Sequence, residues 1–206
     1  MVSFALKHGL RQRPGTLLLF FLGQWLLGLA QAQPEPIDDR AALREFLSHT
    51  IRDANSFEDR FDAEVWLLDM QNRLTPFIDT PEERLALLRE VHHAATQSEL
   101  PPELVLAVIE VESSFDRFAI SRVGAQGLMQ VMPFWKNEIG RDDDNLTQTT
   151  TNLNYGCRIL QYYLQRESGN LRRALAAYNG SLGSHRYSDK VYRAWANRWR
   201  TLPLDW

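Results

Sequence analysis

The sequence predicts a mainly α protein with a single small β-hairpin. Apolar residues recur at three- and four-residue spacing along most of the chain, which is typical of amphipathic helices. Proline or a residue that can cap a helix stands before several of these segments, and polar or glycine-rich stretches separate them. Only residues 116–123 are short and β-branched enough to suggest a hairpin or an extended loop, so strands are too few for a packed sheet.

The first 32 residues have the pattern of a secretory signal peptide. They combine a basic start, an apolar run of 14 residues over 16–29 and a small-residue cleavage pattern at 30–32. A bilayer span needs roughly 20 apolar residues, which is more than this run contains. The sequence therefore favours a cleaved signal peptide over the alternative of a retained membrane anchor. We therefore expect a periplasmic protein, and the residues after the signal suffice for one domain with its own core.

Residues 33–79 are predicted to form a short helical extension before the main domain. A proline-containing linker is followed by one helix over residues 38–55 and a second over residues 56–74. The apolar stripes of these helices allow two roles. They either pack on the core or present a surface to a partner protein.

The main domain, residues 80–206, contains most of the predicted helices. Its first helix begins at Thr80, where Pro81 and Glu83 complete a capping-box pattern. The others are assigned from apolar stripes and start signals. The predicted helices cover residues 80–97, 101–115, 150–166, 170–178 and 188–199, with a short helix from Leu128 that breaks at Met132-Pro133.

The helix over residues 101–115 is apolar on almost every side, yet it carries Glu112. Val105, Val108 and Ile109 lie on the same face as this carboxylate. Burial among apolar neighbours disfavours the ionised form, so we expect a raised pKa, which is the property that a general acid requires. Glu110 lies about 200° away around the helix and cannot share the site.

The residues after this helix are predicted to form the wall of a cleft. Gly124 and Gly127 bracket a tight turn, where glycine allows positive φ and lets a ligand approach the backbone. Asp116 is the only second acid in this stretch, and its position at the helix end favours a capping or loop role. Glu112 is therefore the candidate catalytic acid.

The composition argues against several other classes of function. The chain has a net charge of −3, whereas a nucleic-acid surface needs a basic stripe. The single cysteine, Cys157, excludes an intrachain disulfide and is interpreted as a buried small hydrophobe. Neither the adjacent His92 and His93 nor the polar stretch Asp142-Asp143-Asp144-Asn145 has the pattern of a metal site. We expect a monomer that needs no metal or cofactor.

Five short motifs follow one another in the second half of the chain. They are Glu112-Ser113-Ser114-Phe115, Gly124-Ala125-Gln126-Gly127-Leu128-Met129-Gln130, Met132-Pro133, Asn152-Leu153-Asn154-Tyr155-Gly156 and Ala177-Tyr178-Asn179-Gly180. In this order they resemble the soluble lytic murein transglycosylases of bacterial cell-wall metabolism, the SLT domain family. Each motif alone is a weak signal, but five in register are specific. The resemblance implies a lysozyme-like fold for residues 80–206, with the hairpin at the cleft.

The resemblance also implies a reaction and a set of site residues. Such enzymes cleave the β-1,4 bond between N-acetylmuramic acid and N-acetylglucosamine in peptidoglycan glycan strands without hydrolysing it. Glu112 would protonate the bridging oxygen and then deprotonate the sugar's own 6-hydroxyl, which closes a 1,6-anhydro ring. The N-acetyl group of the substrate replaces a second carboxylate. The implied substrate-binding residues are Ser113, Ser121, Gln130, Met132, Tyr178 and Asn179, with bracing of the helix end as the alternative role of Ser113.

Two other functions stay open at this point. One is a lysozyme-type hydrolase of the same fold, in which Asp116 or another acid positions water. The other is a non-catalytic glycan-binding protein. The motifs also depart from the family, because Gly180 stands where alanine is usual and Ile159 where tyrosine is common. We expect the sugar subsites to differ in length or preference.

Overall fold

The computed structural model describes residues 60–201 of the chain. The predicted signal peptide, the linker and the first helix of the extension lie outside the described residues, as does the end of the chain from residue 202. All described residues belong to one compact unit of the chain. No helix in the described part is long and apolar enough to cross a membrane.

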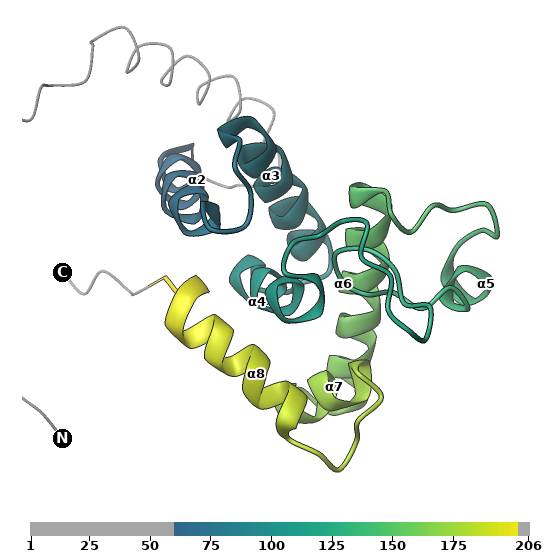
Figure 1. The fold of residues 1–206 in the computed structure, drawn as a ribbon. Coiled ribbons are helices and arrows are strands. Elements are labelled where there is room, and N and C mark those ends of the chain that lie inside the picture. The colour runs from purple at the N-terminus through teal and green to yellow at the C-terminus, as the bar shows by residue number, and fades with distance from the viewer. Residues whose placement is uncertain (1–59, 202–206) are drawn as a thin grey trace, which may run out of the picture. The chain divides into compact units, whose positions relative to one another are not determined.

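All regular elements in residues 60–201 are helices, so the predicted mainly α class is confirmed (Figure 1). In chain order they are α2 (Arg60–Leu74), α3 (Pro81–Gln97), α4 (Pro102–Ser113), α5 (Trp135–Ile139), α6 (Thr149–Arg166), α7 (Leu171–Tyr178), α8 (Arg186–Ala194) and the π-helical turn η1 (Trp195–Trp199). The boundaries predicted for α3, α6 and α7 agree with these bounds to within one residue.

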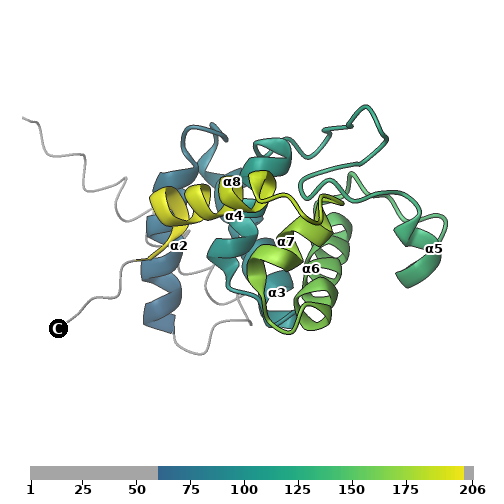
Figure 2. The same cartoon turned by 90° about the horizontal axis from the view of Figure 1, so that it is seen from below.

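The core is built around α4, which packs against α3, α8 and η1 (Figures 1 and 2). Residues 104–109 of α4 are buried on every side, as the continuous apolar run predicted. Leu67 and Met70 of α2 belong to the same core, so the second helix of the extension packs on the domain. The burial of α4 on all sides fixes the position of Glu112 in its last turn.

Local signals explain where several helices begin and end. The helix α3 begins at Pro81 as predicted, although the Thr80 side chain makes no capping hydrogen bond. At the start of α7, the side-chain oxygen of Asn170 accepts a hydrogen bond from the Arg173 backbone N–H at 3.1 Å. The helix α4 ends where Ser114 adopts a left-handed conformation with φ 51°.

The predicted β-hairpin is not confirmed. Within the described residues, 116–131 form a loop, called the cleft loop below, that has only two isolated antiparallel bridges and no regular strand. Gln126 is shared by both bridges, pairing with Ile120 on one side and Val131 on the other. The segment therefore adopts the extended-loop alternative to the hairpin.

The prediction of a short helix from Leu128 is wrong. Residues 127–130 form a turn, closed by a hydrogen bond of 3.1 Å from the Gln130 backbone N–H to the Gly127 carbonyl oxygen. Gln130 has a φ of 48°, and a left-handed residue at this point stops a right-handed helix from propagating. The short helix α5 instead begins two residues after Pro133.

The last helix begins earlier than predicted. Its first residue is Arg186, not Ser188, so Tyr187 lies in the first turn and is buried. Tyr187 and Val191 are one turn apart and point to the same side of α8, toward the core. The helix continues into η1, which places Trp199 fully inside the core.

Candidate active site

The cleft loop is fastened to α6 by one buried side chain, Asn152. Its amide nitrogen donates to the carbonyl oxygens of Gln126 and Leu146, each at 2.8 Å. Its amide oxygen accepts a hydrogen bond from the Met129 backbone N–H at 2.8 Å. Two of these backbone groups, the Met129 N–H and the Leu146 carbonyl oxygen, have no other backbone partner among the described residues. Asn152 satisfies both and so gives the loop a fixed position relative to α6.

Two glycines allow this close packing of the loop against α6. Gly127 has a φ of 76°, and a Cβ there would lie 2.4 Å from both the Asn152 amide nitrogen and the Leu146 carbonyl oxygen. A Cβ on Gly156 of α6 would lie 2.4 Å from the Met129 sulfur. Any side chain at either position would push the loop away from the helix.

A pocket of about 230 Å³ opens beside Glu112, between the cleft loop, α6 and α7. Six of the seven residues predicted for the site line this pocket, namely Glu112, Ser121, Gln130, Met132, Tyr178 and Asn179. The remaining lining residues are mainly apolar, and they include Trp135 and Ile159. We refer to this cavity as the Glu112 pocket.

Glu112 lies in a low-dielectric environment at one wall of the pocket. Burial raises the pKa of its carboxyl group from the ordinary value of 4.5 to about 7, although a hydrogen bond from Tyr187 acts in the opposite direction. This is the raised pKa that the apolar stripe of α4 predicted. A carboxyl group with a pKa near neutrality can both donate and accept a proton at the pH of a cell.

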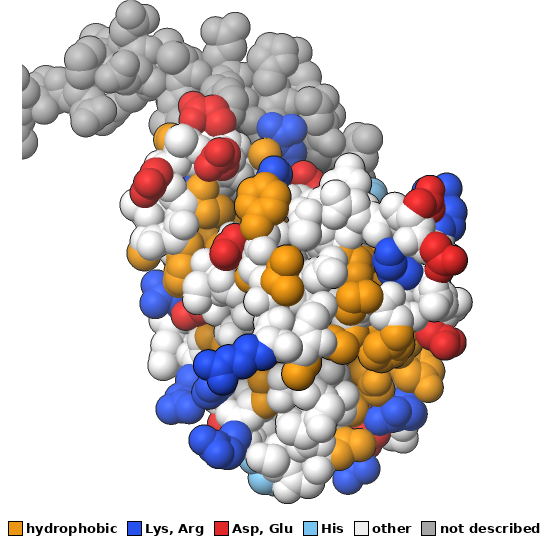
Figure 3. All heavy atoms as spheres, turned by 45° about the vertical axis from the view of Figure 1, so that its right-hand side comes forward, with side chains coloured by type: hydrophobic (Ala, Val, Ile, Leu, Met, Phe, Trp, Pro, Cys, Tyr) orange, Lys and Arg blue, Asp and Glu red, His pale blue; other side chains and the backbone are white. Residues whose placement is uncertain are grey.

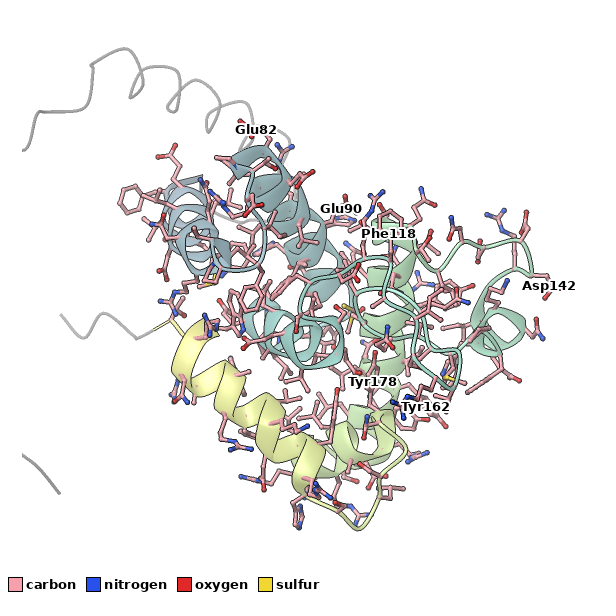
Figure 4. All side chains as sticks on the ribbon, viewed as in Figure 1. Glu82, Glu90, Phe118, Asp142, Tyr162 and Tyr178 are labelled. Carbon is pink, nitrogen blue, oxygen red and sulfur yellow. The ribbon has the colours of Figure 1, made fainter. Side chains whose placement is uncertain are left out.

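Two tyrosines, the buried Tyr187 and the half-buried Tyr178, fix the surroundings of the carboxyl group. The Tyr187 hydroxyl donates to the Glu112 Oε1 atom at 2.6 Å, and the Tyr178 hydroxyl donates to the Met129 carbonyl oxygen at 2.6 Å. Burial, and then the neighbouring charge of Glu112, raise the pKa of both tyrosines well above 10, so both stay protonated donors. Tyr178 projects from α7 toward the cleft loop (Figure 4).

Ser121 and Gln130 each form hydrogen bonds within the cleft loop and each leave one polar group for a ligand. The Ser121 hydroxyl oxygen accepts from the Ala125 backbone N–H at 3.0 Å, and its own hydrogen has no partner among the described residues. The Gln130 amide nitrogen donates to the carbonyl oxygens of Ala119 and Gly127, which leaves its amide oxygen as the group for a ligand. Both side chains therefore support the cleft loop and still offer one polar atom each.

Ser113 lies outside the Glu112 pocket. Its hydroxyl donates to the Leu128 carbonyl oxygen at 2.8 Å and also lies 3.2 Å from the Ile109 carbonyl oxygen. These contacts join the end of α4 to the cleft loop. They support the bracing role that was the alternative to sugar binding.

The acids nearest to Glu112 in the sequence do not line the pocket. A carboxylate oxygen of Asp116 accepts from the Phe118 backbone N–H at 2.9 Å, which is the loop role that its position predicted. Glu110 accepts from the Trp199 indole N–H at 2.7 Å on the other side of α4. Among residues 60–201 no three His, Cys, Asp or Glu side chains are grouped as a metal site. Glu112 is thus the one carboxylate among the lining residues of this pocket.

The sequence analysis did not identify Tyr187. Its contact to Glu112 spans 75 residues, and the predicted helix began after it. The one available signal was the spacing between Tyr187 and Val191, which continues the apolar stripe of α8 backward by one turn. The sequence analysis placed neither Trp135 nor Ile159 in the site, and both line the Glu112 pocket.

The chain is similar to two known transglycosylases. The transglycosylase of Enterobacteria phage PRD1 is 36% identical over 98 residues, which cover 48% of this chain and 36% of the phage protein. The soluble lytic murein transglycosylase of Escherichia coli strain K12 is 29% identical over 134 residues, which cover 60% of this chain and 21% of that protein. The chain thus spans only about a third and a fifth of the lengths of these relatives.

A similar solved structure and a family model complete the comparison. The X-ray structure of an inactive mutant of the lytic transglycosylase Slt from Pseudomonas aeruginosa aligns with 24% identity and a TM-score of 0.43, covering 73% of this chain and 28% of that one. The family model of the transglycosylase SLT domain matches residues 90–198. This match contains all five motifs and extends over more than half of the chain, which therefore belongs to the transglycosylase SLT domain family.

Proposed function

We propose that this protein is a peptidoglycan lytic transglycosylase in which Glu112 is the sole catalytic acid and base. The observation that carries the proposal is a single carboxyl group with a pKa of about 7 in a pocket that the family motifs line. Retaining and inverting glycosidases usually place two carboxyl groups at the bond. A pocket with one such group instead suits a reaction in which the substrate supplies the second reacting group.

The geometry supports a two-step reaction on the β-1,4 bond between N-acetylmuramic acid and N-acetylglucosamine. The protonated Glu112 carboxyl donates its proton to the bridging oxygen, and the bond from that oxygen to the anomeric carbon breaks. The N-acetyl oxygen of the same sugar stabilises the positive charge on the anomeric carbon. The N-acetylglucosamine end leaves with the donated proton on its new hydroxyl group.

The second step returns the proton to Glu112. The carboxylate accepts the proton of the 6-hydroxyl of the muramic acid, and that oxygen attacks the anomeric carbon to close a 1,6-anhydro ring. No water is consumed. The attacking hydroxyl belongs to the bound sugar, so its effective concentration exceeds that of water in a closed pocket. The Tyr187 hydroxyl, at 2.6 Å, stabilises the carboxylate between the two steps.

The remaining proposals concern the rest of the protein. Ser121, Gln130, Met132, Tyr178 and Asn179 are the proposed sugar-binding residues, because each lines the Glu112 pocket. The signal-like pattern of residues 1–32 supports a periplasmic protein, and we propose that it acts as a monomer on the glycan strands. We also propose that residues 33–79 form an extension whose outer surface can bind a cell-wall or secretion-machinery protein.

Product analysis tests the proposed reaction. Purified cell wall digested with the protein is expected to yield muropeptides that end in 1,6-anhydro-N-acetylmuramic acid, 18 Da lighter than hydrolysis products because one water is not added. Mass spectrometry of the soluble fraction separates the two. Reducing ends in place of anhydro ends would show a hydrolase, and the absence of any soluble fragment would show a binding protein.

A further inference from the structure

The helix α8 carries a row of cations on its outer side. Arg186, Lys190 and Arg193 follow one another at four- and three-residue spacing, so they share one face of the helix, and all three are exposed. The buried face of α8, which contains Tyr187 and Val191, is directed at the core instead. We call Arg186, Lys190 and Arg193 the basic stripe.

The charges of the basic stripe are not neutralised within the part of the chain that the structure describes. Asp189 is the one acid of α8, and it forms an ion pair with Arg172 of α7. The Arg193 Nε atom donates to the backbone carbonyl oxygen of Asp189 at 3.2 Å and not to its carboxylate. The other two members of the stripe form no ion pair with a described acid. Three positive charges therefore face the solvent.

The basic stripe belongs to a segment whose charge is opposite to that of the whole chain. Residues 168–201 contain seven Lys and Arg side chains and a single acid, whereas the whole chain has 23 Lys and Arg against 26 Asp and Glu. Lys and Arg side chains gather at the lower left of the face in Figure 3, toward the side on which α8 lies in Figure 1. This side of the molecule is therefore positive although the chain as a whole is negative.

A hollow elsewhere on the molecule has the opposite charge. It has a volume of about 660 Å³ and lies between α3 and the start of the cleft loop. Four acids, Asp79, Glu83, Glu90 and Asp116, are among its lining residues, and Arg117 is the one cation among them. A negatively charged surface attracts the basic stripe and repels this hollow, so it would bind the molecule in a defined orientation.

The arrangement of the stripe fits an extended anionic surface better than a single small anion. Its cations are spread over roughly 10 Å of helix axis, and a further exposed cation, Arg200, follows η1. A site for one phosphate or carboxylate group would need donors that converge on one point, and a row does not provide them. The same helical segment contains the partly buried Tyr192 and Trp195, whose residue types are enriched at the surface of bilayers.

We propose that the basic stripe docks the protein on the surface of an anionic phospholipid bilayer. The lipid phosphate groups supply the complementary charge, and each Lys or Arg near such a surface raises the partition coefficient about fivefold. No residue of the stripe lines the Glu112 pocket, so docking leaves that pocket open to a glycan strand. The inference goes beyond the proposed function and does not depend on it, because binding to a bilayer requires no catalysis.

Co-sedimentation with lipid vesicles tests the inference. Vesicles that contain phosphatidylglycerol are compared with vesicles of phosphatidylcholine alone, and all proteins lack residues 1–32, so that the apolar run of the predicted signal peptide contributes nothing. The wild type should bind the anionic vesicles alone, and its binding should weaken as the salt concentration rises. The triple variant Arg186→Gln, Lys190→Gln and Arg193→Gln should have a partition coefficient about a hundredfold lower.

A second triple variant, Arg117→Gln, Arg141→Gln and Arg158→Gln, is the matched control. It removes the same number of charges from exposed positions outside the basic stripe, so it should bind the anionic vesicles as the wild type does. An equal loss in this control would overturn the inference, because the effect would then come from net charge alone. A wild type that ignores anionic vesicles, or that binds both kinds of vesicle equally, would also overturn it.

A charge-preserving variant separates docking from a structural effect. Arg186→Lys with Arg193→Lys keeps three cations in the stripe and should bind the anionic vesicles as the wild type does. A loss as large as that of the glutamine variant would overturn the inference, as would binding of a soluble anionic polymer through the stripe without binding of vesicles.

Cleavage of purified cell wall keeps this inference distinct from the proposed reaction. The glutamine variant of the stripe should release soluble fragments at the wild-type rate, because its three substitutions lie outside the Glu112 pocket. Vesicle binding by a wild type that cleaves no cell wall would refute the proposed reaction alone. Cleavage by a wild type that binds no anionic vesicles would refute the docking alone.

Discussion

Replacing Glu112 with glutamine is expected to lower kcat for glycan cleavage on the order of a thousandfold, the usual contribution of a general acid and base. Glutamine can neither give nor take a proton, and no other carboxyl group lines the Glu112 pocket to replace it. The fold should be retained, because the Tyr187 hydroxyl can donate to the amide oxygen as it does to the Glu112 Oε1 atom. Release of soluble muropeptides from purified cell wall measures the loss.

Asp116→Asn is the matched control for this substitution. It removes the acid that a hydrolase of this fold would use, while the remaining side-chain oxygen can still accept the hydrogen bond from the Phe118 backbone N–H. We expect near wild-type cleavage from this variant. An Asp116→Asn protein as inactive as Glu112→Gln would place a second carboxylate in the reaction, and a fully active Glu112→Gln protein would remove Glu112 from it.

The second large effect is expected on stability. Asn152→Ala should lower the free energy of unfolding on the order of 3 kcal/mol, because it removes three hydrogen bonds and leaves two backbone groups, the Met129 N–H and the Leu146 carbonyl oxygen, without a partner. The third hydrogen bond is to the Gln126 carbonyl oxygen, which keeps its bond from the Val131 backbone N–H at 2.9 Å. Urea unfolding followed by tryptophan fluorescence measures the change. Cleavage should fall as well, because the loop loses its position beside Glu112.

Asn154→Ala serves as the reference for Asn152→Ala. It makes the same substitution two residues along α6, at a half-buried position, and should change the free energy of unfolding by less than about 1 kcal/mol. Equal stability of the two variants would mean that the three hydrogen bonds of Asn152 do not hold the loop.

The helices were the part of the fold that the sequence predicted well. The apolar run in α4 and the start signals at Pro81 and Asn170 are local features, and each produced the expected helix. The mainly α class is confirmed by the helical structure of the described residues. Local spacing is sufficient for such elements because a helix satisfies its backbone groups within its own segment.

The cleft loop was the part that could not be predicted. Its backbone groups are satisfied by Asn152, which lies more than 20 residues away from Met129 and Gln126 and gives no local signal. The left-handed conformation of Gln130 is imposed by this packing, so the apolar residues around it suggested a helix that does not form. In the cleft loop, hydrogen bonds between residues far apart in the sequence therefore outweighed the local propensities for a hairpin and for a helix.

The candidate site also contains residues that local sequence motifs predict and one residue that only the packing of distant elements reveals. Its motif residues were identified from the sequence, and six of the seven line one pocket. Tyr187 was missed because it acts only through the packing of α8 against α4, which no spacing within either helix reveals. Ser113 was assigned to the sugar from the family resemblance, with bracing of the helix end as the alternative, and its hydroxyl is directed at the backbone of the cleft loop.

The most direct test of the central claim is a titration of the Glu112 carboxyl group, followed by the 13C chemical shift of its side-chain carboxyl carbon. Burial should place the midpoint at about 7, and Tyr187→Phe should raise it further because the hydroxyl stabilises the ionised form. A midpoint near 4.5, the ordinary value for a glutamate in water, would contradict the claim that burial keeps a catalytic proton on Glu112.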